Sequence, residues 1–367
     1  PDPRRRPGTI KAIVEHTGLD RHQVAALLKN EVKYIPLRAL SRLCDYLIEH
    51  GYVSPDDLPG ALFAVEPEDF WELLARRRRL ELCLGVRKAD KKDWPEGAWV
   101  VASDSLLLGA LLNGVSTLGG TSPLKSEGTG RATEAPPHPE HLKQSLVWAP
   151  GQTTDDQVST RATDVYQQFD EARGDKGLIG LGSVKSNPVV EMIFANAFGC
   201  EPFVSADDSP SARKRPCPIF LRYRPDDPHP PSCSAGMQLA RNHAADQPGF
   251  HYEQDDGSWG CVAWDGKTQD AALLFYIHRE AQGRLEVAAG GFSGRATRLL
   301  ARTLATRAAE FWPPTYNRHG VQVGAFLIQY TFSGSESRTR DILESELGAA
   351  EKIIAVSSKV IERRLER

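Results

Sequence analysis

The chain has 367 residues, of which 40% are apolar and 25% are charged, and its formal net charge is −3. This composition is typical of soluble proteins, and the length is enough for two or three domains that need no disulfide or metal to fold. No apolar run is long enough to span a membrane, no signal peptide opens the chain, and the six cysteines contain no CxxC pair. We therefore expect a cytoplasmic protein with free thiols and no membrane partner, and neither a zinc knuckle nor a redox motif.

Charge is divided unevenly along the chain. Residues 1–42 hold nine Lys or Arg and four Asp or Glu, so this segment carries +5 and the remainder −8. A local basic excess suits a module that faces phosphates. The acidic remainder argues against a protein that coats nucleic acid along its whole length.

The first three expected elements are helices, over residues 9–16, 20–30 and 36–48. Gly18 offers the positive φ that a sharp turn between two helices often requires, and Asp20 is a good N-cap for the second helix. One apolar stripe at helical spacing follows, made of Val24, Leu27 and Leu28. A turn followed by a short helix with a polar, basic start is the layout of a DNA-reading helix-turn-helix.

Residues 9–58 resemble the Cro/C1-type (XRE-like) helix-turn-helix. The resemblance implies a homodimer that binds double-stranded DNA on half-sites about one helical turn apart. It places base edges against Arg21, His22 and Gln23. The DNA phosphates would be contacted by Lys29, Asn30, Lys33 and Tyr34, and by a basic N-terminal arm that contains Arg4, Arg5 and Arg6. The alternatives are a helical packing or dimerisation module, a solvated arm, and a packing role for Tyr34.

The start of the chain departs from that family. Such domains usually carry another helix before the helix-turn-helix pair, and here only Pro1–Pro7 precede it. The chain also begins without Met, so we expect residues to be missing upstream.

A domain of alternating strands and helices is predicted over 80–367, after a helix-turn-helix domain over 1–65 and a linker helix over 66–79. Strands are expected at 80–86, 99–102, 146–148 and 178–181, and helices at 104–112, 153–169 and 187–198. This alternation predicts an α/β Rossmann-like domain whose sheet is mostly parallel and covered on both faces. Residues 119–145, rich in Gly, Pro, Ser and Thr, are predicted as a flexible loop.

The second half of this domain begins with an irregular insertion over 205–260, dense in Pro, Asp and Ser, with a strand at 219–223. Strands are then expected at 271–278, 285–289 and 321–332, and a helix over 294–311. The tail from Arg340 mixes an amphipathic helix with a β-leaning segment over 353–360.

Two loops, 180–187 and 290–297, each follow an apolar strand and open a helix. Such loops line the crevice at the carboxyl ends of parallel strands, and helix N-termini offer N–H groups to anions. Neither loop matches the dinucleotide fingerprint, the P-loop or the hydrolase elbow. We predict that they bind a small, phosphate-bearing anion through Gly182, Ser183, Lys185, Ser186, Asn187, Gly291, Ser293, Gly294, Arg295 and Thr297. The alternative is that these residues only serve tight turns and caps.

No spacing in the sequence assembles a catalytic triad or a carboxylate pair, so no catalytic residue is assigned. Residues that could act as a general base are Asp104, Glu191 and Asp270. His251 and His278 have no partner at a recognisable catalytic spacing. His138 and His141 have the spacing of a metal pair but lack further ligands, so we expect neither a metal nor a cofactor.

We therefore expect a DNA-binding transcription regulator whose α/β domain senses a small anionic, nucleotide-like ligand or dimerises. One alternative is an enzyme acting on a nucleotide or NAD-type substrate, with the helix-turn-helix as its regulatory module. Another is a non-catalytic assembly protein.

Overall fold

The computed structural model describes residues 9–28, 35–52, 67, 69–89, 97–120, 139–204, 217–237, 247–316, 321–332 and 348–365. The chain divides into two compact units, residues 1–66 and 67–367. Within the described ranges, no helix is both long and apolar enough to cross a membrane.

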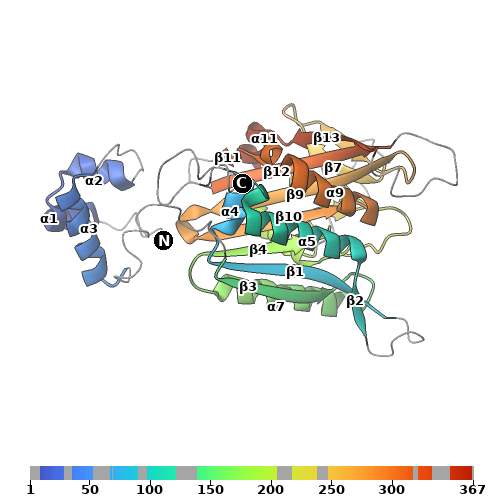
Figure 1. Cartoon of the computed structure of the whole chain (residues 1–367), viewed down its shortest axis with the longest axis horizontal. Helices are drawn as coiled ribbons and strands as arrows, with labels where there is room; N and C mark the ends of the chain where they lie inside the picture. Colours follow the sequence, from blue (N-terminus) through green and yellow to red (C-terminus); the bar gives the residue numbers. More distant parts are fainter. Residues whose placement is uncertain are drawn as a thin grey trace. The chain divides into compact units, whose positions relative to one another are not determined.

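The N-terminal unit contains three described helices, α1 (Thr9–Thr17), α2 (Arg21–Leu28) and α3 (Leu37–Glu49) (Figure 1). They lie where helices were predicted, although residues 29 and 30 fall outside the described residues. The helices pack around a small core of their own, formed by Ile13, Leu19, Val24, Ala39 and Tyr46. Because the helices are short, this shared core rather than intrinsic propensity holds them together.

The larger unit is built on a nine-stranded mixed sheet. Its central strands lie in the order β3 (His141–Trp148), β1 (Arg79–Lys88), β4 (Lys176–Leu181), β10 (Arg284–Gly291), β9 (Gln269–Arg279) and β12 (Val321–Thr331). The pairs β3–β1, β1–β4 and β4–β10 are parallel, whereas β9 is antiparallel to both β10 and β12. Three shorter strands pair antiparallel at the margins: β2 (Ala98–Val100) with β1, and β11 (Thr315–Tyr316) and β13 (Ala350–Ala355) with β12.

The prediction of a mostly parallel, Rossmann-like sheet is therefore wrong, because among the described strands of this sheet five pairings are antiparallel and three are parallel. Only a short 3₁₀ turn, η7 (Glu280–Gln282), and Gly283 separate β9 from β10. So short a connection permits only an antiparallel hairpin, because a parallel crossover needs about a dozen residues.

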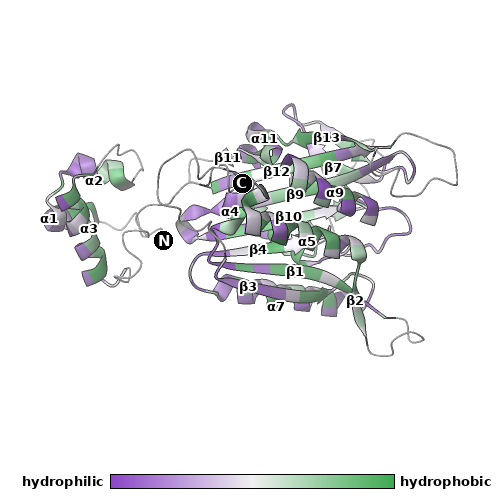
Figure 2. Cartoon of the chain, in the orientation of Figure 1, coloured by the Kyte–Doolittle hydropathy of each residue, from purple (hydrophilic) through white to green (hydrophobic). Residues whose placement is uncertain are grey.

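Helices cover both faces of the sheet (Figure 1). One face carries α4 (Phe70–Ala75), α5 (Ala102–Thr117), η4 (Leu118–Gly120), α9 (Gly294–Arg307) and η8 (Ala308–Phe311). The other carries α7 (Asp155–Glu171), α8 (Val189–Phe198), α11 (Ser358–Leu365) and a smaller sheet. The central strands are largely apolar (Figure 2), as expected for strands buried on both faces.

The smaller sheet lies in the predicted irregular insertion. Its strands run in the order β6 (Ala235–Gly236), β5 (Ile219–Arg222), β7 (Gly249–Glu253) and β8 (Trp259–Ala263). The pair β5–β6 is parallel, and the other two pairs are antiparallel. Residues 205–216 and 238–246 of the predicted insertion lie outside the described residues.

Every strand and helix expected in the larger unit overlaps one in the structure, but several boundaries differ. Within the segment 66–79, predicted as a linker, α4 is buried in the core of the larger unit. Of the predicted loop 119–145, residues 121–138 lie outside the described residues, and β3 begins at His141, before the loop was expected to end. The tail was predicted to contain both a helix and a strand-like segment, and the structure has both, the strand β13 followed by the helix α11.

Candidate functional site

A capping box opens α2 in the N-terminal unit. Asp20 Oδ1 accepts hydrogen bonds from the N–H groups of His22 (2.7 Å) and Gln23 (2.8 Å). In return, Gln23 Oε1 accepts one from the Asp20 N–H (3.3 Å). This reciprocal arrangement satisfies N–H groups that the helix itself leaves without partners. The sequence predicted the cap at Asp20 but missed the structural role of Gln23.

The turn before α2 is fixed by α1 and α3. Gly18 has a φ of +70°, as predicted, and its N–H donates to Val14 O (3.0 Å). Thr17 Oγ1 donates to Ile13 O (2.6 Å), and Arg42 Nη1 of α3 donates to Thr17 O (3.3 Å). The start of α2 is thus held in a defined position on its own unit.

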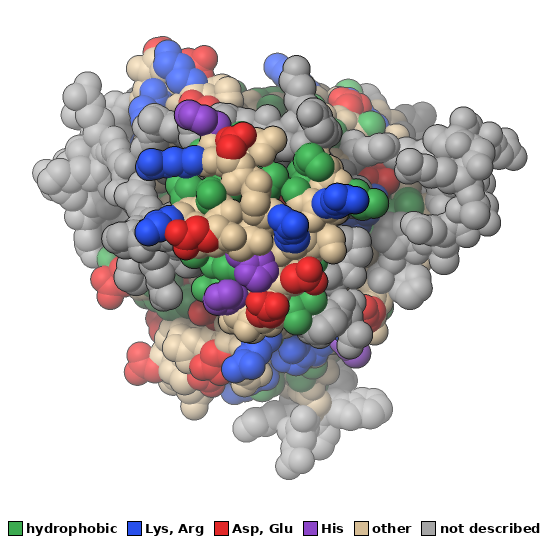
Figure 3. Space-filling model, turned by 90° about the vertical axis from the view of Figure 1, so that its left-hand side faces the viewer, with side chains coloured by type: hydrophobic (Ala, Val, Ile, Leu, Met, Phe, Trp, Pro, Cys, Tyr) green, Lys and Arg blue, Asp and Glu red, His purple; other side chains and the backbone are tan. Residues whose placement is uncertain are grey.

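Arg21, His22 and Gln23 are exposed on the first turn of α2. The N-terminus of a helix carries partial positive charge, which adds to that of Arg21. The other residues predicted to contact DNA lie outside the described residues: Arg4, Arg5, Arg6, Lys29, Asn30, Lys33 and Tyr34. Among the residues coloured in Figure 3, Lys and Arg side chains are interspersed with Asp, Glu and apolar ones.

The two predicted ligand loops of the larger unit lie side by side, because each follows one of the adjacent parallel strands β4 and β10. The N–H of Gly182 donates to Ala289 O (2.8 Å). A Cβ on Gly290 would lie 2.6 Å from Gly182 Cα, so the two backbones touch and leave no room for a side chain. The sequence therefore predicted correctly that both loops lie at the carboxyl edge of the sheet, where their strands end.

Polar groups of the first loop are held by the protein itself. Asn187 is fully buried, and its Nδ2 donates to Cys83 O (2.8 Å) and Leu181 O (3.0 Å). Lys185 Nζ lies 3.1 Å from Asp227 Oδ2 and 3.7 Å from the centroid of the Phe292 ring. Burial lowers the pKa of the Lys185 ammonium to about 8. Ser183 is buried, and Ser186 Oγ donates to its carbonyl (3.2 Å).

The second loop is organised in the same way. Ser293 Oγ caps α9 by accepting the N–H of Arg295 (3.1 Å), and it donates to the buried carboxylate of Asp270. Thr297 Oγ1 accepts the Gly291 N–H (3.0 Å), and the Arg295 guanidinium stacks 3.2 Å from the centroid of the Phe332 ring. Gly294 packs near Ser103 of α5. These contacts support the alternative view of both loops as turns and caps, and their anion-binding role stays a prediction.

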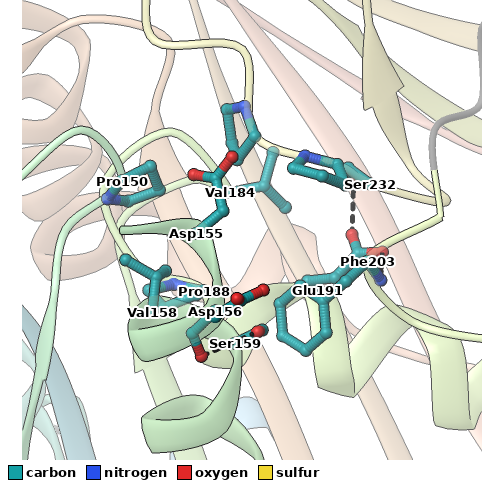
Figure 4. Close-up of a pocket in the computed structure, with 12 residues that line it drawn as sticks. Pro150, Asp155, Asp156, Val158, Ser159, Val184, Pro188, Glu191, Phe203 and Ser232 are labelled. Carbon is teal, nitrogen blue, oxygen red and sulfur yellow. Dashed lines mark hydrogen bonds between the residues drawn. The ribbon is translucent and has the colours of Figure 1, made fainter. Parts of the chain in front are cut away.

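A cavity of about 190 Å³ opens beside the first loop, where α7 and α8 begin at the carboxyl ends of β3 and β4 (Figure 4). Val184 and Pro188 form one part of its wall, and Asp155 and Asp156 approach from the start of α7. Its other lining residues are Pro150, Val158, Ser159, Glu191, Phe203, Pro230, Pro231 and Ser232. The carboxyl edge of the sheet is where open α/β sheets bind ligands. The sequence analysis placed Asp155 and Asp156 in a helix but did not connect them with a site.

Glu191, considered as a base from the sequence, is buried at this cavity. Its carboxylate accepts hydrogen bonds from Ser232 Oγ (2.5 Å), the Cys233 N–H (2.6 Å) and the Phe203 N–H (3.1 Å). Burial raises the pKa of this carboxyl group above its ordinary value. Together with Asp155 and Asp156, it gives the cavity an acidic lining, which disfavours an anion and suits a ligand with cationic or hydrogen-bond donor groups.

The structure does not bring the remaining catalytic candidates together. Asp104 is buried at the start of α5, where burial raises its pKa to about 6. His278, on β9, lies opposite the first residues of β10, at the edge where the parallel strands begin. His251 belongs to the smaller sheet, and its Nε2 donates a hydrogen bond to the Gln247 carbonyl (2.9 Å).

The comparisons with known proteins concern the start of the chain. A family model described as the Cro/C1-type HTH DNA-binding domain matches residues 4–49. This confirms the resemblance predicted from the sequence. The searches of curated proteins and of solved structures returned no match.

Proposed function

Because residues 4–49 match a family model of the Cro/C1-type helix-turn-helix DNA-binding domain, we propose that this protein is a transcription regulator that reads DNA with α2 and assembles through its larger unit. The observation that carries the proposal is the family match, and the geometry of α2 supports it. The first turn of this helix is exposed, polar and firmly capped. A preorganised helix start of this kind can enter a major groove without first paying an ordering cost.

The test of DNA reading is a selection of bound sequences from random duplexes by the full chain, followed by affinity measurements at several salt concentrations. Arg21→Ala should weaken binding to the selected site by about 1–3 kcal/mol and relax preference at one base pair. Gln23→Glu should have a similar effect while folding is retained, because a glutamate still accepts the hydrogen bond of the capping box.

Lys11→Ala is the matched control, since Lys11 is exposed on α1 and pairs only with Glu15 (3.7 Å) among the contacts described. It should leave sequence preference unchanged. Failure of the folded protein to retain any duplex at low salt would contradict the proposal, as would unchanged preference in both α2 variants.

A homodimer, expected for this kind of DNA reader, is proposed to form through the edge strand β3. Among the described residues, β3 pairs only with β1. Leu142 and Leu146 lie opposite Leu80 and Leu84, which are buried, yet they are themselves 57% and 44% exposed. An edge strand that has no described strand on its outer side and that exposes apolar side chains is suited to a second copy of the same strand.

Leu142→Glu together with Leu146→Glu tests this arrangement by sedimentation velocity. The wild type should sediment as a dimer and the double variant as a monomer, because two pairs of like charges would face each other across the two-fold axis. Val204→Glu alters an exposed apolar residue elsewhere in the same unit and should leave the dimer intact. A monomeric wild type, or a dimeric double variant, would refute the β3 interface.

A small-molecule effector is proposed to bind the acidic cavity beside the first loop. Its binding would favour one arrangement of the two N-terminal units in the dimer. The acidic lining favours an amine-bearing molecule, whereas the two loops were predicted to bind a phosphate-bearing anion. Thermal-shift measurements with a panel of diamines and a panel of nucleotides separate these ligands. Asp155→Asn with Asp156→Asn should abolish the shift caused by a diamine, and Lys185→Ala should abolish one caused by a nucleotide.

A further inference from the structure

Three of the six cysteines meet in the larger unit, although they are far apart in the sequence. Cys200 follows α8, Cys217 precedes β5, and Cys233 precedes β6. All three Sγ atoms lie within 4.8 Å of one another, and those of Cys217 and Cys233 are 3.9 Å apart. No short sequence motif marks this cluster, because it forms only when the smaller sheet packs beside α8.

The spacing of the sulfur atoms fits a common tetrahedral metal ion. In a zinc–thiolate site each Zn–S bond is about 2.3 Å, which places neighbouring sulfurs about 3.8 Å apart. The observed Cys217–Cys233 separation is close to this value, so a small rotation of Cys200 would complete a triangle of ligands. Such soft thiolate donors favour zinc over magnesium or calcium.

We infer that Cys200, Cys217 and Cys233 bind one Zn²⁺ ion through their three Sγ atoms. Cys217 and Cys233 are buried, at 1% and 5% exposure, whereas Cys200 is partly exposed. Solvent therefore reaches the cluster on the Cys200 side, where the fourth ligand would be water or a group from solution.

Glu191 holds two of the ligand-bearing turns in place. Its Oε1 accepts the Cys233 N–H (2.6 Å) and the N–H of Phe203 (3.1 Å), three residues beyond Cys200. Hydrogen bonds that fix the backbone beside a ligand are typical of metal sites. Because each cysteine belongs to a different segment, the ion would join the end of α8 to the starts of β5 and β6, in the region where the smaller sheet has its shortest strand.

The experiment measures zinc in the full-length protein purified under reducing conditions. The protein is stripped with a chelator, returned to Zn²⁺, freed of excess ion and analysed by elemental mass spectrometry. The wild type should retain one zinc per chain, and replacement by Co²⁺ should give the intense absorption of a thiolate-bound tetrahedral ion. Mg²⁺ and Ca²⁺ should not compete.

The chain offers a matched control, because its other three cysteines lie outside the cluster. The triple variant Cys200→Ser, Cys217→Ser, Cys233→Ser should retain no zinc, whereas Cys44→Ser, Cys83→Ser, Cys261→Ser should retain one ion per chain. If the first variant does not fold, Cys200→Ser alone, at the partly exposed position, should still weaken zinc retention at least tenfold. Alkylation of the wild type adds a readout without mutation, since zinc should protect the three cluster thiols together.

Two results would overturn the inference. One is a reduced, folded wild type that retains no stoichiometric zinc and whose cluster thiols are alkylated equally fast with and without the ion. The other is a disulfide between two of these cysteines in the protein purified under reducing conditions, because that bond would remove two ligands.

Discussion

Asn187 is the residue on which the first loop depends most. Its side chain donates to Cys83 O and Leu181 O and accepts the Val189 N–H (3.0 Å), so it joins β1, β4 and the start of α8. Asn187→Ala leaves these buried groups without partners and should lower the free energy of unfolding by about 2–4 kcal/mol. Asn113→Ala makes the same change at an exposed position of α5 and should shift it by less than about 0.5 kcal/mol. Equal urea midpoints for the two variants would contradict this role.

His278 makes the larger unit sensitive to acid. Burial and the neighbouring Arg77 lower the pKa of its imidazole to about 4, from an ordinary value of 6.5. Arg77 Nη1 donates to Nε2 (3.0 Å), so Nδ1 carries the proton and donates to Gln322 Oε1 (3.1 Å). The imidazole of the unfolded chain takes up a second proton more readily than the imidazole of the folded chain. The contribution of His278 to the free energy of unfolding is therefore complete above pH 6.5 and is lost as the pH falls towards 4.

For this shift in the pKa of His278, the free energy of unfolding falls by about 3 kcal/mol. His278→Gln should flatten the decline in the free energy of unfolding between pH 6.5 and 4, measured by urea titration at each pH. His22→Gln, at an exposed position of α2, is the control and should leave the slope unchanged. A slope that is the same in all three proteins would show that the imidazole does not contribute.

At the scale of the residue, the sequence predicted features whose chemistry is local. Gly18 and Asp20 act on groups within a few positions along the chain, and both do what was expected. The polar groups of the two loops were harder to interpret, because Lys185 meets Asp227 and Ser293 meets Asp270 only in the folded chain. The cysteine cluster was missed for the same reason.

At the scale of the element, close backbone contact between β1 and the first loop requires Gly85. A Cβ at this position would lie 1.8 Å from Ser186 O, which is backbone and cannot move aside without shifting the loop. Gly85→Ala should therefore cost more than about 3 kcal/mol of stability. Gly109→Ala, on α5 where a Cβ meets nothing within 4 Å, should instead stabilise the protein by about 0.5–1 kcal/mol. Thermal unfolding that ranks the two variants in the reverse order would contradict the contact.

Element positions were predicted better than strand directions. The apolar pattern locates β9 and β10, but direction depends on the connection between them, and the few residues of η7 force a hairpin. The pattern likewise located the strand β5 but not the small sheet around it, because β6 has only two residues and carries little periodic signal.

At the scale of the whole molecule, the two units have separate cores, so each should unfold on its own. Calorimetry should show two transitions, and a selected DNA duplex should raise only that of the N-terminal unit. A chain of residues 67–367 should keep the second transition within about 2 °C of its position in the full chain. A single transition that moves as a whole on DNA binding would contradict this independence.

The capping box of α2 has an evolutionary consequence. Gln23 accepts a hydrogen bond that caps α2, and in the proposed DNA-reading role it would also face a base edge, so a mutation there should change stability and operator preference together. Only glutamine and glutamate retain both the reach and the acceptor that the cap requires. Descendants of this protein that acquire new target sites should therefore vary at Arg21 and His22 and keep one of those two side chains at position 23.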